Sequence, residues 1–192
     1  IDEKGYNPIL KIDFADKKIT RILEQKSLGG FSLSPNDDFM IFSYSFVHKP
    51  TELAKLDLND NEIIDLTNIN GDFTEQVDVR PAEQIWIEGS NGKQIQVFLV
   101  KPHNFDSNKK YPFVINVHGG PQMQWRDSFR GDWQVYPGSG YVLAFPNPHG
   151  STGFGAEFTR DISLGWDGNV YNDIMNVMDS LENLSYVDKE RM

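Results

Sequence analysis

The chain has 192 residues, of which 39% are hydrophobic and 24% are charged, a composition typical of globular proteins with one or two domains. Its net charge of -10 comes from charged residues spread along the whole chain, so that neither half concentrates basic residues, and nucleic acid or an acidic membrane is an unexpected partner. No cysteine is present, which excludes disulfides, thiolate metal sites and a cysteine nucleophile.

The first twenty residues do not have the pattern of a signal peptide. Residues 1–20 alternate charged and apolar residues without the long apolar core of a signal peptide, and the first residue is Ile1. No run reaches the ~18 apolar residues of a membrane-spanning helix. We therefore expect the sequence to begin inside a longer protein. Because a chain without cysteine fits a reducing cytosol and a bacterial periplasm equally well, the compartment stays open between the two.

Short strands separated by turn residues are predicted from residue 9 to residue 66. Ser, Pro, Asn and Asp are concentrated at 34–38 and 59–61, where they favour tight turns. The pattern favours an antiparallel meander, as in a propeller blade or part of a sandwich. The predicted strands are 9–14, 31–33, 39–44, 53–58 and 63–66.

After a predicted linker at 68–72, a hairpin is expected with strands at 84–88 and 94–100. The pair Asn91-Gly92 between them is a strong signal for a hairpin turn, since both residues tolerate positive φ. The hairpin ends the part of the chain that is typical of an all-β protein.

Two near-continuous apolar runs follow, at 113–117 and 141–145, as expected for strands that are buried on both faces of a sheet. Between Val170 and Leu184 the apolar residues recur every three or four positions, which predicts a helix with one apolar face. Strands and a covering helix together predict the beginning of an α/β fold whose sheet continues past Met192.

The motif His118-Gly119-Gly120-Pro121 directly follows the first of these apolar runs. A turn at the end of a buried strand can present backbone N–H groups rigidly, and two glycines let the backbone approach a substrate carbonyl closely. A bare Gly-Gly pair is also typical of a simple turn. The motif alone leaves both readings open.

The neighbouring residues resemble the prolyl oligopeptidase family of serine peptidases, in particular its acylaminoacyl-peptidase and dipeptidyl-peptidase 5 branch. The strand and turn at 111–121 are similar to that branch's motif ending in HGGP, and 140–155 is similar to its segment ending in NPRGSTGYG. The order and separation of the two motifs also agree. Further residues resemble the helix and lead-in before the family's nucleophile strand: Asp161, Gly165, Trp166, Asp173 and 188–192.

The resemblance implies an α/β fold, with the first half of an α/β-hydrolase domain preceded by the last blade region of an all-β propeller. Residues 1–76 would end the propeller, and 77–192 would form the N-terminal part of the peptidase domain. The segments 31–38 and 52–58 are similar to the family's last blade. The remaining part of the same enzyme is then the expected partner of this chain, while its oligomeric state stays open.

For the active site, the resemblance implies that the backbone N–H of Gly120 is one donor of the oxyanion hole. No Gly-x-Ser-x-Gly occurs in the sequence, so the serine and the other members of the Ser-Asp-His triad would lie beyond it. This chain alone is predicted to be inactive. The whole enzyme is expected to hydrolyse peptide bonds of short peptides; a carboxylesterase of the same fold and a non-catalytic interaction module are the alternatives.

Two polar residues of the second motif, His149 and Ser151, bear on its chemistry. His149 stands where the family usually has arginine, and an imidazole cannot reproduce the permanent bidentate contact of a guanidinium, which puts the expected ion pair in doubt. Ser151 lacks a glycine two positions before it and a strand-to-helix elbow, so we interpret it as a turn serine and not as a nucleophile.

No metal and no cofactor are expected, because the histidines are not spaced as metal ligands usually are; they are His48, His103, His118 and His149. The spacing of Trp125, Phe129 and Trp133 favours one amphipathic helix packed on the sheet, with a hydrophobic substrate pocket as the alternative.

Overall fold

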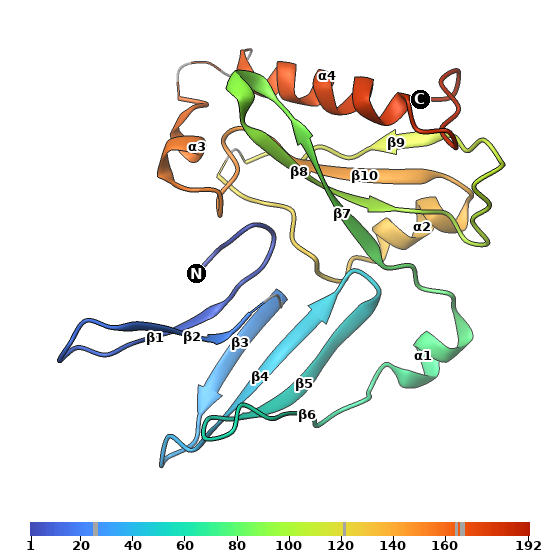
Figure 1. The fold of residues 1–192 in the computed structure, drawn as a ribbon. Coiled ribbons are helices and arrows are strands. Elements are labelled where there is room, and N and C mark those ends of the chain that lie inside the picture. The colour runs from blue at the N-terminus through green and yellow to red at the C-terminus, as the bar shows by residue number, and fades with distance from the viewer. Residues whose placement is uncertain (25–26, 121, 164, 166–167) are drawn as a thin grey trace. The chain divides into compact units, whose positions relative to one another are not determined.

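The computed structural model describes residues 1–24, 27–120, 122–163, 165 and 168–192, which form two compact units (Figure 1). The first unit comprises Ile1–Val79 and Arg126–Phe129, and the second comprises Arg80–Trp125 and Arg130–Met192. The predicted boundary falls after residue 76. The assignment of the two domains to a propeller and a hydrolase stays a prediction at this point.

The first unit contains a four-stranded antiparallel sheet in the order β3-β4-β5-β6, so the predicted meander is present. Its core is a cluster of apolar side chains that includes Met40, Phe42 and Leu56. A separate antiparallel pair, β1 and β2, precedes the sheet, and β2 was not predicted. The strands are β1 (Ile9–Ile12), β2 (Ile19–Leu23), β3 (Ser27–Leu33), β4 (Phe39–Phe46), β5 (Lys49–Asp57) and β6 (Ile63–Asp65).

The predicted linker at 68–72 is partly wrong, because helix α1 (Gly71–Gln76) begins inside it. The buried carboxylate of Glu52 in β5 accepts hydrogen bonds from the backbone N–H groups of Ile69 (3.1 Å) and Asn70 (2.9 Å). These bonds fix the residues before α1 against the sheet. The segment is therefore ordered by a buried acid that local turn chemistry does not reveal.

The second unit contains a four-stranded sheet in the order β7-β8-β10-β9, formed by β7 (Ala82–Glu88), β8 (Gln94–Val100), β9 (Phe113–Ile115) and β10 (Val142–Asn147). Strand β10 pairs parallel to β9, and the other pairs are antiparallel. The predicted hairpin is confirmed: Asn91 (φ 55°) and Gly92 (φ 69°) both adopt positive φ in the turn between β7 and β8.

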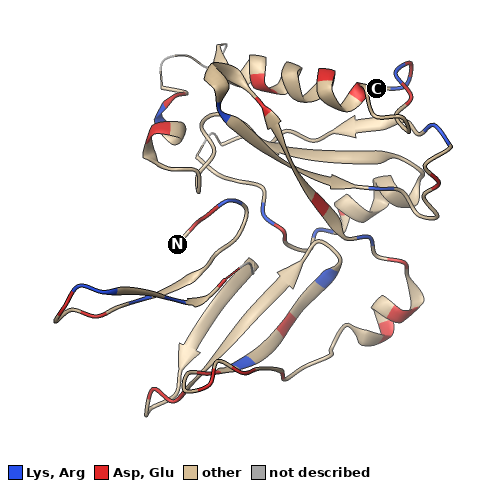
Figure 2. Cartoon of the chain, in the orientation of Figure 1, with Lys and Arg blue, Asp and Glu red and all other residues tan. Residues whose placement is uncertain are grey.

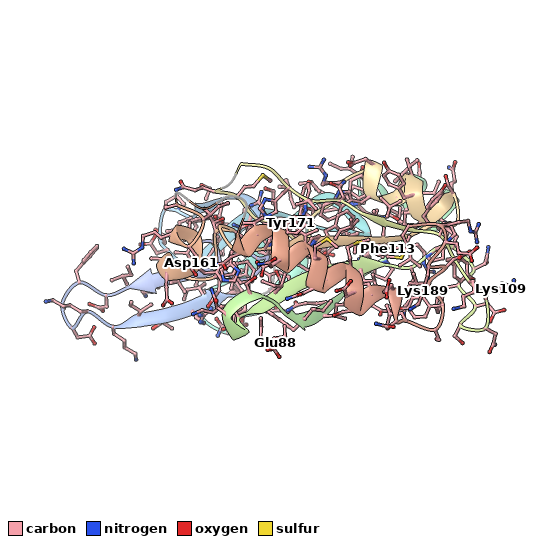
Figure 3. The ribbon with its side chains drawn as sticks, turned by 90° about the horizontal axis from the view of Figure 1, so that it is seen from above. Glu88, Lys109, Phe113, Asp161, Tyr171 and Lys189 are labelled. Carbon is pink, nitrogen blue, oxygen red and sulfur yellow. The ribbon has the colours of Figure 1, made fainter. Side chains whose placement is uncertain are left out.

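Strand β10 is buried on both faces, as its continuous apolar sequence predicts. Val142 and Ala144 pack in the cluster that contains Val177 of α4 (Asn169–Glu182), and Phe145 stacks on Trp133 of α2 (Asp132–Gly138) with 3.4 Å between ring centroids. Because neighbouring strand residues point to opposite faces, α4 and α2 cover opposite faces of the sheet (Figures 1 and 3).

Helix α4 confirms the helix predicted near Val170–Leu184. The short helix α3 (Ala156–Arg160) lies between β10 and α4 in the sequence. None of the helices among the described residues has the length and apolarity needed to span a membrane. In each unit, acidic and basic residues are intermingled along the strands and loops (Figure 2).

The amphipathic helix predicted from Trp125, Phe129 and Trp133 is wrong, since α2 begins only at Asp132. The backbone N–H of Trp125 is bound by the Asn147 side chain (2.7 Å), and Phe129 belongs to the first unit. Contacts distant in sequence therefore override the helical spacing. Packing was the correct alternative for Trp125 and Trp133, which are buried in the second unit.

Candidate active site

The loop formed by residues 116–125 begins directly after β9 and contains the glycine motif. The backbone N–H of Asn116 donates to Ala144 O (2.8 Å), which continues the pairing with β10. Gly120 follows in an exposed position with φ +136°. A Cβ there would lie 3.1 Å from Met123 Cγ and 3.2 Å from the backbone N of Gln122, so both its conformation and its surroundings require glycine.

The backbone N–H of Gly120 is available to a ligand, since no described residue accepts a hydrogen bond from it. The structure leaves Gly119 less restricted: its φ is not in the left-handed region, and a Cβ there would meet no atom within 4 Å. The two glycines therefore differ, and Gly120 is the constrained one. Pro121, the last residue of the motif, lies outside the described residues.

His118 attaches this loop to the turn that follows β10. Its Nδ1 lies 3.0 Å from Gly119 O, and its Nε2 lies 2.9 Å from Ser151 Oγ. Burial lowers the pKa of His118, although the contact with the Gly119 carbonyl opposes this shift. A lowered pKa favours the neutral imidazole at pH 7. The uncharged ring then joins the Gly119 carbonyl to the Ser151 hydroxyl.

Ser151 is fully buried and lies 2.6 Å from the Pro148 carbonyl as well as next to His118. It precedes the turn at 152–153, and α3 starts only at Ala156, so no strand-to-helix elbow surrounds it. This position agrees with its interpretation as a turn serine.

A second polar network lies under the loop and was not anticipated. The Asn147 side chain is fully buried at the end of β10, where Oδ1 accepts from the Trp125 N–H (2.7 Å) and Nδ2 donates to Trp125 O (3.0 Å). Nδ2 also donates to Gln96 Oε1 (2.8 Å), on β8. The available sequence signal was an asparagine that ends an otherwise apolar buried strand.

His149 keeps a carboxylate contact at the position where an ion pair was in doubt. Its buried Nδ1 lies 2.5 Å from Asp173 Oδ2, and its Nε2 lies 3.6 Å from Asp161 Oδ2. The Asp173 carboxylate also accepts from the backbone N–H of His149 (2.8 Å) and of Ser90 (2.7 Å). One buried acid thus joins α4, the β7–β8 turn and the segment after β10, and His149 stacks on Phe158 beside it.

Among the described residues, no group of three or more His, Asp or Glu side chains is arranged to hold a metal ion. Two of the residues that resemble the family's helix and lead-in, Asp161 and Asp173, both contact His149. A third, Trp166, lies outside the described residues.

Residues 127–192 match the sequence model of the prolyl oligopeptidase family. Dipeptidyl-peptidase 5 of Schizosaccharomyces pombe is 34% identical over 181 residues, which is 91% of this chain and 25% of that protein. An uncharacterized peptidase, YuxL, of Bacillus subtilis is 29% identical over 88% of this chain and 26% of its own length. The chain thus spans about a quarter of the length of these relatives.

The fold is also similar to that of solved peptidases. Pyrococcus horikoshii acylaminoacyl peptidase superposes with a TM-score of 0.86 at 22% identity, covering 98% of this chain and 29% of that one. Porphyromonas gingivalis dipeptidyl peptidase 4 gives a TM-score of 0.79 at 22% identity, covering 98% of this chain and 27% of that one. At this identity the superpositions support the fold alone.

Proposed function

The chain belongs to the prolyl oligopeptidase family, and from that premise we propose that it is part of a serine peptidase that hydrolyses peptide bonds of short peptides. In this proposal its first unit ends a β-propeller, and its second unit begins the α/β-hydrolase domain. The observation that carries the proposal is the backbone N–H of Gly120, an exposed residue in the loop that follows β9, because no described residue accepts a hydrogen bond from it.

The chemistry assigns one step to this chain. A serine beyond Met192 attacks the carbonyl carbon of the scissile peptide bond, while a histidine takes the serine proton and later donates it to the leaving amine. The carbonyl oxygen becomes an oxyanion in the tetrahedral intermediate. Gly120 N–H donates one hydrogen bond to that oxyanion, and the N–H after the serine donates the second.

The direction of the chain along the edge of β9 that faces away from β10 supports this position for the serine. Tyr111 N–H donates to Tyr186 O (2.8 Å), and Phe113 N–H donates to Arg191 O (3.0 Å), so the chain already runs beside β9 before Met192. The bridge between Tyr111 and Val187 is parallel. A strand continuing in this direction would end beside the loop that carries Gly120, as the proposed oxyanion hole requires.

The test uses the full-length protein and an adjacent pair of glycine variants. We expect the wild type to react with a fluorophosphonate serine probe and to hydrolyse peptide amides. Gly120→Ala should lower kcat about 100-fold, because the strained residue moves the N–H donor, while Gly119→Ala should cause a much smaller loss. Proline is a poorer variant, because its fixed φ is incompatible with +136° at Gly120.

Three results would contradict the proposal in different ways. Equal kcat values for Gly120→Ala and the wild type would remove Gly120 from the oxyanion hole. Hydrolysis of aryl esters without hydrolysis of peptide amides would favour a carboxylesterase. A full-length protein that neither binds the probe nor hydrolyses either substrate would favour a non-catalytic interaction module.

A further inference from the structure

The side chain of Asn147 binds both backbone polar groups of one residue in the 116–125 loop, an arrangement that we call a bracket. Its Oδ1 accepts from Trp125 N–H (2.7 Å) and its Nδ2 donates to Trp125 O (3.0 Å), so the carboxamide fixes both polar groups of that residue. Gln96 lies directly opposite Asn147 in the β8–β10 pairing, and its Oε1 accepts the other Nδ2 proton (2.8 Å). Asn147 and Gln96 are both 0% exposed, so water does not compete for these bonds.

Trp125 carries this restraint back to the start of the loop. Its indole Nε1–H donates to Asn116 O (3.0 Å), which ties the last residue of the loop to the first. The indole ring also meets the His118 ring edge to face, with 5.7 Å between centroids. The loop is thus closed at its base, and its conformation depends on where Trp125 is held.

The middle of the loop is fastened to the same segment of the chain. Thr152 N–H donates to Met123 O (3.0 Å), and His118 contacts Ser151. Met123 is the side chain that a Cβ on Gly120 would touch, so it lies against the strained glycine. Residues 147–152 therefore form the platform under the loop, and Asn147 is the member of that platform that makes three buried hydrogen bonds through its side chain.

We infer that Asn147 is a positioning residue that holds the 116–125 loop so that the Gly120 N–H points at the oxyanion. The inference rests on the proposed function and adds to it. Asn147 does not touch the substrate. It acts through Trp125, and its contribution is the fixed direction of a donor that would otherwise sample several orientations. Displacements of about 1 Å remote from the reacting atoms can cost about 100-fold in rate.

Asn147→Ala removes all three side-chain hydrogen bonds of Asn147. Asn147→Asp keeps the acceptor for Trp125 N–H but places a carboxylate oxygen, which cannot donate, next to Trp125 O. Gln134 provides a matched control on α2, because its Oε1 accepts from Arg80 N–H (2.7 Å) and its Nε2 donates to Arg80 O (3.0 Å). Gln134→Ala thus removes the same kind of bracket from a different backbone residue. All variants are made in the full-length protein.

The readouts separate positioning from general stability. For Asn147→Ala we expect kcat on a peptide amide to fall at least about tenfold, with KM changed by less than about threefold. Inhibition by a peptide aldehyde, whose hemiacetal places an oxyanion in the hole, should weaken by the same factor as kcat/KM. Amide hydrogen exchange in 117–125 should accelerate, while exchange in β8 and β10 stays slow. Asn147→Asp should show the same pattern, and Gln134→Ala should show none of it.

A variant that is less stable but keeps wild-type kcat and aldehyde affinity would overturn the inference. So would equal losses for Asn147→Ala and Gln134→Ala. If Asn147→Ala fails to fold, Asn147→Asp decides the question by the same criteria. An active wild type with unaffected Asn147 variants refutes only this inference, whereas an inactive, unlabelled wild type refutes the proposed function and this inference together.

Discussion

Replacing Asp173 with alanine removes one acceptor from three donors in the interior of the second unit. These donors are the backbone N–H groups of Ser90 and His149, at 2.7 and 2.8 Å, and the His149 ring nitrogen Nδ1, at 2.5 Å. Asp173 is 0% exposed, so bulk water does not reach these donors to replace the carboxylate as their acceptor. A buried donor without an acceptor costs about 1–3 kcal/mol. Allowing for partial relaxation, we expect the variant to lose about 3–5 kcal/mol of unfolding free energy.

The measurement is urea unfolding of the full-length protein followed by pulsed hydrogen exchange, with peptides from α4 reporting on the second unit alone. For a urea dependence of about 2 kcal/mol per molar, the midpoint for these peptides should fall by roughly 1.5–2.5 M. Asp179→Ala is the control, because Asp179 is an exposed aspartate on the same helix. If Asp173→Ala and Asp179→Ala had the same midpoint, the argument that this carboxylate holds three elements together would be wrong.

Three further changes test other contacts. Burial alone would raise the pKa of Glu52, but hydrogen bonds from Thr67, Asn70 and Ile69 lower it to about 2, from 4.5, so its stabilisation is complete above pH 4.5 and is lost as the pH falls toward 2. The shift corresponds to about 3 kcal/mol, so Glu52→Gln should lose up to that amount of unfolding free energy at pH 7 and flatten the acid limb of a stability–pH curve. Gly150→Ala should destabilise by about 2–5 kcal/mol in thermal unfolding, since φ is +94° and a Cβ would lie 3.0–3.1 Å from three Ile162 atoms. Trp133→Ala should cost about 3–5 kcal/mol in urea unfolding, because the fully buried ring stacks on Phe145.

Each of these predictions has an outcome that would contradict it. If the unfolding free energy of Glu52→Gln falls between pH 4.5 and 2 as steeply as that of the wild type, the lowered pKa of Glu52 does not stabilise the protein. Gly140 also has positive φ (+86°) but open space around a Cβ, so equal losses for Gly140→Ala and Gly150→Ala would exclude the clash with Ile162. A loss below about 1 kcal/mol for Trp133→Ala would show that the stacked ring contributes little packing.

Elements with strong local signals could be predicted from the sequence. The hairpin at Asn91-Gly92 and the helix α4 carry their own turn and periodicity signals, and the structure has both. The strand before the glycine motif was also predicted, but its predicted burial on both faces is wrong, because β9 lies at the edge of the sheet and is only partly buried after Phe113. The φ of +136° gives the second glycine of the motif a conformational reason.

Other features depend on contacts between residues that are distant in the sequence. Helix α1 lies where a linker was predicted, next to residues bound by Glu52. The bracket of Asn147 around Trp125 joins positions 22 residues apart, and the spacing of aromatic residues there suggested a helix instead. A side-chain amide that replaces a regular backbone partner leaves no periodic signal, so only the folded chain reveals it.

The short segment Arg126–Phe129 makes the first unit discontinuous. Asp127 accepts from the backbone N–H of Val47 (2.8 Å), and its own N–H donates to Gly5 O (3.1 Å). During synthesis the first unit therefore cannot form these contacts until the ribosome has also translated Arg80–Trp125 and the four residues themselves. A gene fragment that stops after Val79 would encode a unit without these contacts, so the first unit is better cloned together with the chain through Phe129.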